Sequence, residues 1–259
     1  MSDVQITARS RAALVTGGAQ RIGGAIVQAL ADAGYAVAIH VNRSRAAAEQ
    51  LCADIAAKGG TAAIVSGDLA GHDAVQRLVP EAVKAVGALT LLVNNAGSFE
   101  ADAFGALDRD VFDRQFAVNL RAPLFLSEAF AVQAPRGADA SIVNIVDQRV
   151  FKPTPRFVSY TLTKCALHTA TTTLAQALAP HVRVNAVAPG PTLPSPRQDA
   201  AEFAKQAATV PLGGGPTPRA IADAVLYLAG ASAVTGVTIA VDGGQHIAWE
   251  TPDNVGIEE

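Results

Sequence analysis

The sequence predicts an α/β fold in which helices flank both faces of a central, mainly parallel sheet of seven strands. Three observations support this prediction. Short runs that are apolar throughout, such as residues 37–41 and 141–146, recur along the chain. Segments with apolar residues at helical spacing, such as residues 75–86, separate these runs. A glycine-rich turn at residues 17–24 joins the first apolar run to the first helical segment.

Each expected strand is a short apolar run, and such continuous runs indicate strands that are buried on both faces of a parallel sheet. The strands are expected at residues 12–16, 37–41, 62–66, 89–94, 141–146, 183–188 and 238–241. Each expected helix carries an apolar stripe or is rich in alanine, and Gly34 ends the first one. The helices are expected at residues 25–33, 45–58, 75–86, 108–131, 157–179 and 218–229. This alternation predicts a doubly wound, Rossmann-type fold with ligands at the carboxyl ends of the strands.

We expect these elements to form a single domain over residues 1–259, with its core at about 12–247. No linker rich in Pro, Gly or Ser divides the chain. Several prolines and three consecutive glycines lie in residues 190–216, which predicts a substrate loop with a short helix near 199–208. Residues 248–259 are expected to form a C-terminal tail.

Charge and hydropathy disfavour several classes of function. The chain has 20 Lys and Arg against 23 Asp and Glu, a formal net charge of −3, and no basic block. Nucleic-acid binding and membrane-surface binding are therefore disfavoured. Residues 1–10 contain no apolar core for a signal peptide, and no later run is long enough to span a membrane. We expect a cytoplasmic protein that acts on a small molecule and has no metal site.

The turn at residues 17–24 predicts nucleotide binding. A strand, a glycine turn and a helix let a pyrophosphate approach bare backbone, and the N–H groups at the helix start point toward its charge. An ordinary glycine-rich turn between strand and helix is the alternative.

The end of the second strand, His40-Val-Asn-Arg43-Ser44, favours NADP(H) over NAD(H). Folds selective for NAD generally end this strand in an acid, which would repel a 2′-phosphate. No acid is present here. Arg43 can form a charged fork on the phosphate and Ser44 can donate to it, although Arg43 could instead be a solvated cation.

Tyr160 and Lys164 lie four residues apart in an expected helix, so both occupy one face of it. A tyrosine is a useful acid at neutral pH only if a fixed positive charge stabilises its phenolate. Lys164 would supply that charge. An acid, Asp147, lies upstream at the end of an expected strand.

Taken together, these motifs resemble the short-chain dehydrogenase/reductase family, from about residue 12 to about residue 247. The matching motifs are Thr16-Gly-Gly-Ala-Gln-Arg-Ile-Gly23, Asn94-Asn-Ala-Gly97, Asn119, Tyr160-x-x-x-Lys164 and Asn185-x-x-x-Pro189-Gly190. Two positions depart from the family pattern. Arg21 stands where the family usually has Gly, and Asp147 replaces the usual Ser, 13 residues before Tyr160. Both departures are similar to the pteridine reductases, a branch that includes bacterial dihydrofolate and dihydromonapterin reductases.

The resemblance implies a cofactor site for NADP(H) and a set of catalytic roles. The residues expected at the cofactor are Gly17, Gln20, Arg21, Ile22, Gly23, His40, Asn42, Arg43, Ser44, Asp68, Leu69, Asn95, Ala96, Gly97, Tyr160, Lys164, Pro189, Gly190 and Thr192. Tyr160 is expected to donate a proton, and Lys164 to hold the nicotinamide ribose and lower the pKa of Tyr160. Asn119 is expected to keep a helix locally open for a water path to Lys164.

The expected substrate contacts are Arg21, Phe99, Asp147, Tyr160 and Leu193. In an ordinary ketone reductase, the Ser hydroxyl donates to the carbonyl oxygen, whereas an ionised Asp147 would repel the oxyanion that forms there. A pterin presents ring nitrogens that must gain protons, and Asp147 next to Tyr160 could relay one. Phe99 matches an aromatic on which the branch stacks the pterin ring. Arg21 could contact the pterin or bind only the phosphates.

Three hypotheses about function follow. The leading one is an NADPH-dependent reductase of a pteridine-type substrate. The second is a reductase of another carbonyl, such as a sugar, a ketone or a 3-oxoacyl thioester, and Asp147 and Phe99 argue against it. The third is a noncatalytic NADP(H) sensor, against which the intact Tyr160 and Lys164 argue. The resemblance also implies a homotetramer in which the helix with Tyr160 and the preceding long helix pack against a second copy.

Overall fold

The computed structural model describes residues 11–195 and 197–250. Seven strands form one sheet in the order β3-β2-β1-β4-β5-β6-β7, and every neighbouring pair is parallel. The strands are β1 (Ala12–Val15), β2 (Ala36–Val41), β3 (Ala62–Ser66), β4 (Leu91–Asn94), β5 (Ala140–Ile145), β6 (Val182–Pro189) and β7 (Thr238–Val241). This is the predicted Rossmann-type α/β fold.

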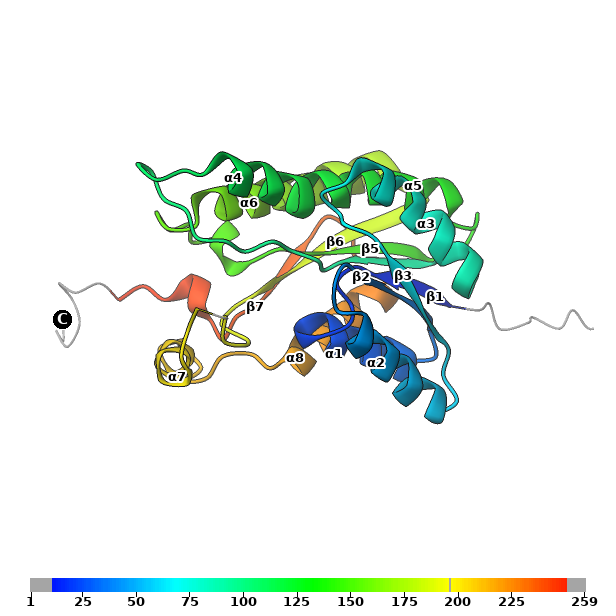
Figure 1. The fold of residues 1–259 in the computed structure, drawn as a ribbon, viewed down its shortest axis with the longest axis horizontal. Helices are drawn as coiled ribbons and strands as arrows, with labels where there is room; N and C mark the ends of the chain where they lie inside the picture. The colour runs from blue at the N-terminus through cyan, green and yellow to red at the C-terminus, as the bar shows by residue number, and fades with distance from the viewer. Residues whose placement is uncertain (1–10, 196, 251–259) are drawn as a thin grey trace, which may run out of the picture.

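Helices cover both faces of the sheet (Figure 1). On one face lie α3 (His72–Val86), α4 (Arg109–Phe116), α5 (Ala122–Gln133) and α6 (Val158–Leu178). On the other lie α1 (Arg21–Asp32), α2 (Arg45–Ala57) and α8 (Pro218–Gly230). The remaining helix, α7 (Ala200–Ala208), lies apart from both layers near one end of the sheet.

Alternate side chains of the strands feed two large cores, and a smaller third cluster contains Val146, Leu167, Ala186 and Ala188. In β1, Leu14 joins the core under α3, α5 and α6, while Ala13 and Val15 join the core under α1 and α8. Successive side chains of a strand point to opposite faces, so a strand that is covered on both sides is mostly apolar, and its polar side chains need hydrogen-bond partners. All eight residues of β6 are buried, and its two polar side chains are paired, Arg183 with Asp139 and Asn185 with the Val234 carbonyl oxygen.

Two predicted helices differ from the observed ones. Helix α1 begins at Arg21, within the glycine-rich turn, rather than at residue 25. The predicted helix over 108–131 is interrupted by a π-helical segment, η1 (Ala117–Arg121), between α4 and α5. Such single π-turns are frequent at functional sites, and this one contains Asn119.

The strand order reverses direction between β1 and β4, since the chain first builds β2 and β3 on one side and then β4 to β7 on the other. In open α/β sheets, ligands bind in the crevice outside the carboxyl ends of the strands at such a point. The fold therefore places the glycine-rich turn after β1 beside the segment that follows β4.

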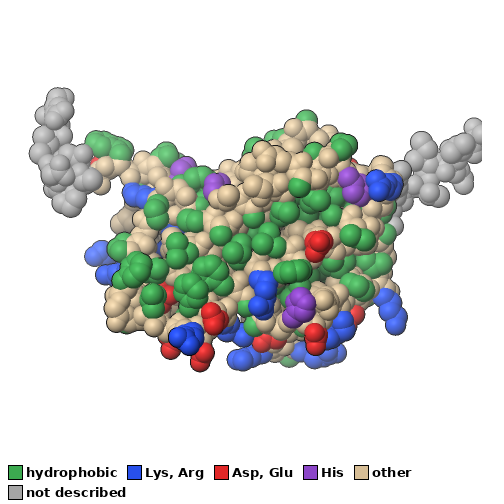
Figure 2. All heavy atoms as spheres, turned by 90° about the horizontal axis from the view of Figure 1, so that it is seen from above, with side chains coloured by type: hydrophobic (Ala, Val, Ile, Leu, Met, Phe, Trp, Pro, Cys, Tyr) green, Lys and Arg blue, Asp and Glu red, His purple; other side chains and the backbone are tan. Residues whose placement is uncertain are grey.

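Hydrophobic side chains gather on the face that α4, α5 and α6 present to the surface (Figure 2). Phe125 and Val132 of α5 and Leu162 of α6 are exposed there, Val132 to 84%. Within the described part of the chain, no helix combines the length and hydropathy needed to cross a membrane. The expectation about residues 1–10, and most of the expected tail at 248–259, lie outside the described residues.

Candidate active site

A cleft of about 1320 Å³ opens at the carboxyl ends of the strands. The glycine-rich turn, the ends of β2, β4, β5 and β6, and the substrate loop line it. All of the residues predicted to bind cofactor or substrate line this one cleft. Of the predicted catalytic residues, Asn119 is buried behind the cleft rather than at its surface.

Two glycines of the glycine-rich turn, Gly17 and Gly23, occupy positions that do not readily accept a side chain. Gly17 has a left-handed backbone conformation, with φ +61°, and a Cβ on Gly23 would collide with the Gly17 carbonyl oxygen and the Asn95 side chain. Helix α1 starts without a side chain that caps its first N–H groups, and its first turn contains no acid. Its uncapped N-terminus therefore suits an anion that enters the cleft.

His40 fixes this turn from β2. Its Nδ1 accepts a hydrogen bond from the Gly17 N–H at 3.1 Å, and its Nε2 lies 3.0 Å from the Gly67 carbonyl oxygen, to which it must donate. An imidazole with one acceptor and one donor nitrogen is neutral. Burial also lowers the pKa of His40, which favours the same neutral form. His40 therefore supports the cofactor turn through its ring nitrogens.

Arg43 and Ser44 lie at the rim of the cleft after β2, and the Arg43 side chain is exposed. After the neighbouring strand β3, Asp68 accepts from the Ala70 N–H at 3.0 Å and pairs with Arg114 at 3.2 Å. The hydrogen bond from Ala70 and the Arg114 guanidinium lower the pKa of Asp68. Asp68 thus caps its own turn and still lines the cleft.

Tyr160 and Lys164 lie on one face of α6, as their spacing predicts, and both are buried. The Tyr160 hydroxyl donates to Asp147 Oδ2 at 3.0 Å. Lys164 Nζ donates to the Ile145 carbonyl oxygen at 2.7 Å. Helix α6 and the end of β5 therefore bring three of the four predicted catalytic side chains together, those of Asp147, Tyr160 and Lys164.

The pKa values of this group differ from one sequence-based expectation. Burial, and then the Asp147 carboxylate, raise the pKa of Tyr160 well above 10.0, so the expected lowering by Lys164 does not dominate here. Burial lowers the pKa of Lys164 from 10.5 to about 8. At neutral pH the tyrosine therefore holds its proton, while the lysine is mostly charged.

Arg149, which the sequence analysis did not identify, pairs with Asp147. Its Nη1 lies 3.1 Å from Oδ2 and 3.3 Å from Oδ1, and its backbone N–H donates to Oδ1 at 2.9 Å. The guanidinium also lies 6.0 Å or less from the ring centres of Phe99, Phe157 and Tyr160. This ion pair could have been predicted from the sequence, because Arg149 follows the acid Asp147 by two residues just after a strand.

Phe99 forms one wall of the substrate side of the cleft. Its ring stacks on Phe157 at 4.5 Å between centres and meets Tyr160 edge-on at 4.6 Å. The Arg197 guanidinium lies 5.1 Å from the centre of the Phe99 ring. One face of Phe99 therefore packs on Phe157, which the sequence analysis did not identify.

Asn119 ties the segment after β4 to α6. Its side-chain oxygen accepts from the Ser98 N–H at 2.7 Å, and its amide donates to the Ser98 carbonyl at 2.9 Å and to Thr163 Oγ1 at 3.2 Å. The structure thus places Asn119 in a supporting position, bound to Thr163, the residue directly before Lys164 on α6.

A second buried support was not predicted. Both carboxylate oxygens of Asp102 accept from the Ser159 N–H, at 3.1 and 3.2 Å, and the Asp102 carbonyl accepts from the Phe157 N–H at 2.9 Å. No side chain within α6 caps its first turn. Asp102 therefore caps the helix that carries Tyr160 from a distant segment of the chain.

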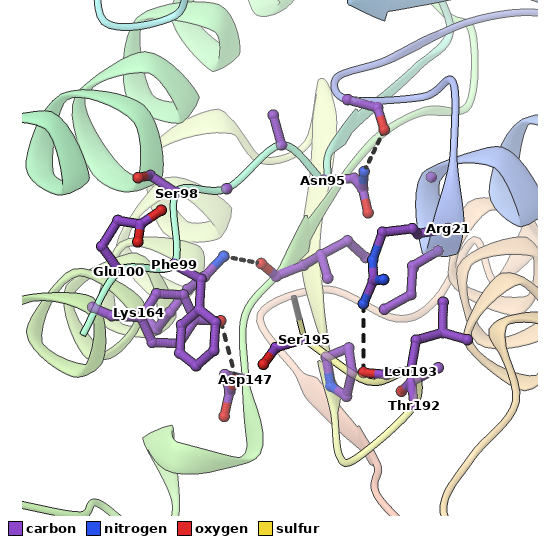
Figure 3. Close-up of a pocket in the computed structure, with 18 of the residues that line it drawn as sticks. Arg21, Asn95, Ser98, Phe99, Glu100, Asp147, Lys164, Thr192, Leu193 and Ser195 are labelled. Atoms are coloured by element: carbon purple, nitrogen blue, oxygen red, sulfur yellow. Dashed lines mark hydrogen bonds between the residues drawn. The ribbon is translucent and has the colours of Figure 1, made fainter. Parts of the chain in front are cut away.

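The substrate loop lines the cleft and is bound to Arg21 at its start. Arg21 Nη2 donates to the Pro194 carbonyl oxygen at 2.9 Å and to the Leu193 carbonyl at 3.4 Å (Figure 3). Thr192 Oγ1 donates to the Gly190 carbonyl at 3.0 Å. Among the described residues, no group of three or more His, Cys, Asp or Glu side chains could hold a metal ion.

Residues 11–205 match the protein family described as short chain dehydrogenase. The crystal structure of FolM alternative dihydrofolate reductase 1 from Brucella canis, complexed with NADP, is 50% identical with a TM-score of 0.91, covering 94% of this chain and 96% of that chain. The protein of the same name from Brucella suis, in complex with NADP, is also 50% identical with a TM-score of 0.91, covering 94% and 98%. L-rhamnose 1-dehydrogenase (NAD(P)(+)) from Sphingomonas sp. (strain SKA58) is 35% identical over 242 residues, which are 90% of this chain and 95% of that protein.

Proposed function

Because the chain belongs to the short chain dehydrogenase family, we propose that it is an NADPH-dependent reductase of a pteridine-type substrate, such as a dihydropteridine, dihydromonapterin or dihydrofolate. The Brucella proteins that are 50% identical were solved with NADP and are called alternative dihydrofolate reductases. The cleft geometry supports the same cofactor and the same substrate class independently of those names.

The cleft fits NADP(H) in three places. The bare backbone at Gly17 and Gly23 and the uncapped start of α1 suit a pyrophosphate. Arg43 is exposed at the rim where a 2′-phosphate would lie, and the end of β2 provides no acid to repel it. Lys164 would hold the nicotinamide ribose, and it lines the same cleft as Asp68, Leu69 and Thr192.

The observation that carries the substrate assignment is the contact between Asp147 and Tyr160. The tyrosine hydroxyl is bound to a carboxylate, at 3.0 Å, where a carbonyl reductase would offer a serine hydroxyl. A carboxylate at this position would repel the negative charge that develops on a carbonyl oxygen. It suits a substrate that presents nitrogen atoms, which gain protons or donate hydrogen bonds.

Bound NADPH supplies a hydride. Tyr160 supplies the proton, which its raised pKa keeps on the hydroxyl at neutral pH. Asp147 accepts the hydrogen bond from that hydroxyl and so fixes the direction in which its proton lies. Arg149 balances the charge of Asp147, so the pair can remain in a partly buried cleft. The proton leaves the Tyr160 hydroxyl. The positive charge of Lys164, 5.7 Å from the centre of the tyrosine ring, lies close to the phenolate that remains.

The flat shape of the substrate is supported by the aromatic wall. Phe99 and Phe157 form a stacked pair beside Tyr160, and a planar heterocycle can pack against such a wall. Leu193 and Arg21 line the facing side. Arg21 is bound to the substrate loop through Nη2, which leaves its other nitrogens for phosphate or substrate.

We also propose a homotetramer. The surface of α4, α5 and α6 is rich in hydrophobic side chains (Figure 2), including the exposed Phe125, Val132 and Leu162. A contiguous apolar patch of this kind supports a self-complementary contact between two copies. Light scattering at micromolar concentration tests this proposal, which a monomer would contradict.

Oxidation of NADPH, followed by absorbance with a panel of substrates, tests the proposed function. Dihydropteridine, dihydromonapterin and dihydrofolate should support turnover, whereas a ketone, a sugar and a 3-oxoacyl thioester should support much less. Turnover confined to the carbonyl substrates would replace this proposal with the carbonyl reductase. NADPH binding without turnover of either group would favour the sensor.

A further inference from the structure

Arg21 connects two walls of the cleft that are far apart in sequence. It is the first residue of α1, in the turn that faces the cofactor, and its Nη2 binds the carbonyl oxygens of Pro194 and Leu193 in the substrate loop. Figure 3 shows the guanidinium directed at this loop. Within the described part of the chain, Nε and Nη1 of Arg21 have no partner, so they stay free to contact a ligand.

The backbone of Arg21 is strained. Its φ is +55°, in the left-handed region, and Phe157 is the other non-glycine residue with positive φ in the described chain. A Cβ makes this conformation unfavourable, whereas glycine adopts it freely. A strained residue in a cleft persists when its surroundings hold it there, and it points to a role for the side chain.

The described residues of the substrate loop are buried at Pro191, Thr192 and Val210, so the part between Thr192 and Val210 needs such an anchor. Helix α7, in the middle of the loop, has no buried residue. The return of the loop is attached where the Leu212 N–H donates to the Gly243 carbonyl at 3.0 Å. The part of the loop before α7 is attached at two places. Arg21 binds its backbone, and Arg197 donates to the Phe99 carbonyl at 2.7 Å and to Glu100 at 3.0 Å. A segment with so little buried surface opens locally unless specific bonds hold it.

We propose that Arg21 is a latch for the substrate loop, which means that its guanidinium holds the Leu193 and Pro194 backbone over the cleft. The benefit of this contact explains why a strained non-glycine residue occupies position 21. Arg21 then acts on the substrate through Leu193, as a positioning residue. The latch does not depend on the identity of the substrate, so it can hold or fail independently of the pteridine proposal.

Two variants separate the latch from the strain. Arg21→Ala removes the guanidinium and keeps a Cβ at φ +55°, whereas Arg21→Gly removes both. Hydrogen exchange of the amides in residues 200–209 reports loop opening, and a peptide from α8 (Pro218–Gly230) is the internal control. Each protein is measured with saturating NADPH and again without it, so that loss of cofactor cannot imitate loss of the latch.

Both variants should exchange faster in residues 200–209 by about tenfold or more, the effect of losing a hydrogen bond from a charged group, with no change in α8. The KM of the substrate should rise more than kcat falls. Arg21→Gly should melt at a higher temperature than Arg21→Ala, because only glycine relieves the strain. Loop exchange as slow as in the parent protein, or equal acceleration in α8, overturns the latch. Equal or reversed melting temperatures overturn the part of the proposal that concerns strain.

Discussion

The Tyr160 hydroxyl donates a 3.0 Å hydrogen bond to the Asp147 carboxylate, and this bond joins helix α6 to the end of β5 at the centre of the cleft. The Arg149 guanidinium donates to the same carboxylate oxygen, Oδ2, and its backbone N–H donates to Oδ1. Proton donor, acceptor and countercharge thus meet at one carboxylate. The proposed reaction depends on the contacts among these three groups.

Tyr160→Phe should lower turnover by roughly 10²–10⁴-fold, the range for a lost acid–base group, and should leave NADPH affinity within about twofold. The reason is that only the hydroxyl is removed from a buried ring. Steady-state kinetics and a fluorescence titration with NADPH measure the two effects. Tyr227→Phe is the matched control, since Tyr227 is 58% exposed on α8 and does not line the cleft. Substantial turnover in Tyr160→Phe would mean that another group delivers the proton.

Arg43→Ala should weaken NADPH binding by about tenfold or more, because a charged hydrogen bond to the 2′-phosphate contributes on the order of 1.5–3 kcal/mol. NADH affinity should hardly change. Arg45→Ala is a suitable control, since Arg45 is exposed nearby, pairs with Glu49 and does not line the cleft. An equal loss with both cofactors would show that Arg43 has a structural role instead.

The pH dependence of kcat/KM should report Lys164. Burial lowers its pKa to about 8, so the folded enzyme loses this positive charge as pH rises through about 8. The rate should therefore fall across that range, well below the titration of Tyr160, whose pKa is raised. In Lys164→Arg, whatever activity remains should lose this step because a guanidinium stays charged. A step that stays near pH 8 in that variant belongs to another group.

Asp102→Ala should destabilise the fold by about 1–3 kcal/mol, because the N-terminus of α6 loses its cap and Ser159 loses a buried acceptor. Turnover should fall more than NADPH affinity, since α6 positions Tyr160. Asp102→Asn retains an acceptor oxygen and should recover much of the stability. Chemical denaturation and kinetics of the three proteins give the comparison. Equal stability of the Ala variant and the parent protein would contradict the capping role.

Much of the fold could be predicted because its strands are short, mostly apolar runs, as strands covered on both faces require. The predicted strands at 62–66 and 238–241 coincide with β3 and β7. The π-helical segment at Asn119 could not be predicted from local pattern, because its residues are fixed by hydrogen bonds to Ser98 and Thr163 on other segments. The early start of α1 is also a tertiary effect, since glycines have low helix propensity.

The cleft residues of the motifs could be predicted because a parallel sheet brings strand ends together. Unlike Arg149, whose partner lies two residues away, two of the residues that were missed act across long sequence separations. Asp102 caps a helix that begins 56 residues later, and Arg197 reaches Phe99 from the substrate loop. No local signal in the sequence pairs such residues. Their partners follow only from the path of the folded chain.

Asp147→Ser tests the central claim most directly, since it installs the residue that a carbonyl reductase would have. Steady-state NADPH oxidation is measured for the parent protein and the variant with a dihydropteridine and with a ketone. Pteridine reduction should fall by roughly 10²–10⁴-fold while ketone reduction holds or rises. A folded variant that binds NADPH and reduces the pteridine as fast as the parent protein would contradict the account, as would a parent protein that reduces ketones readily and pteridines not at all.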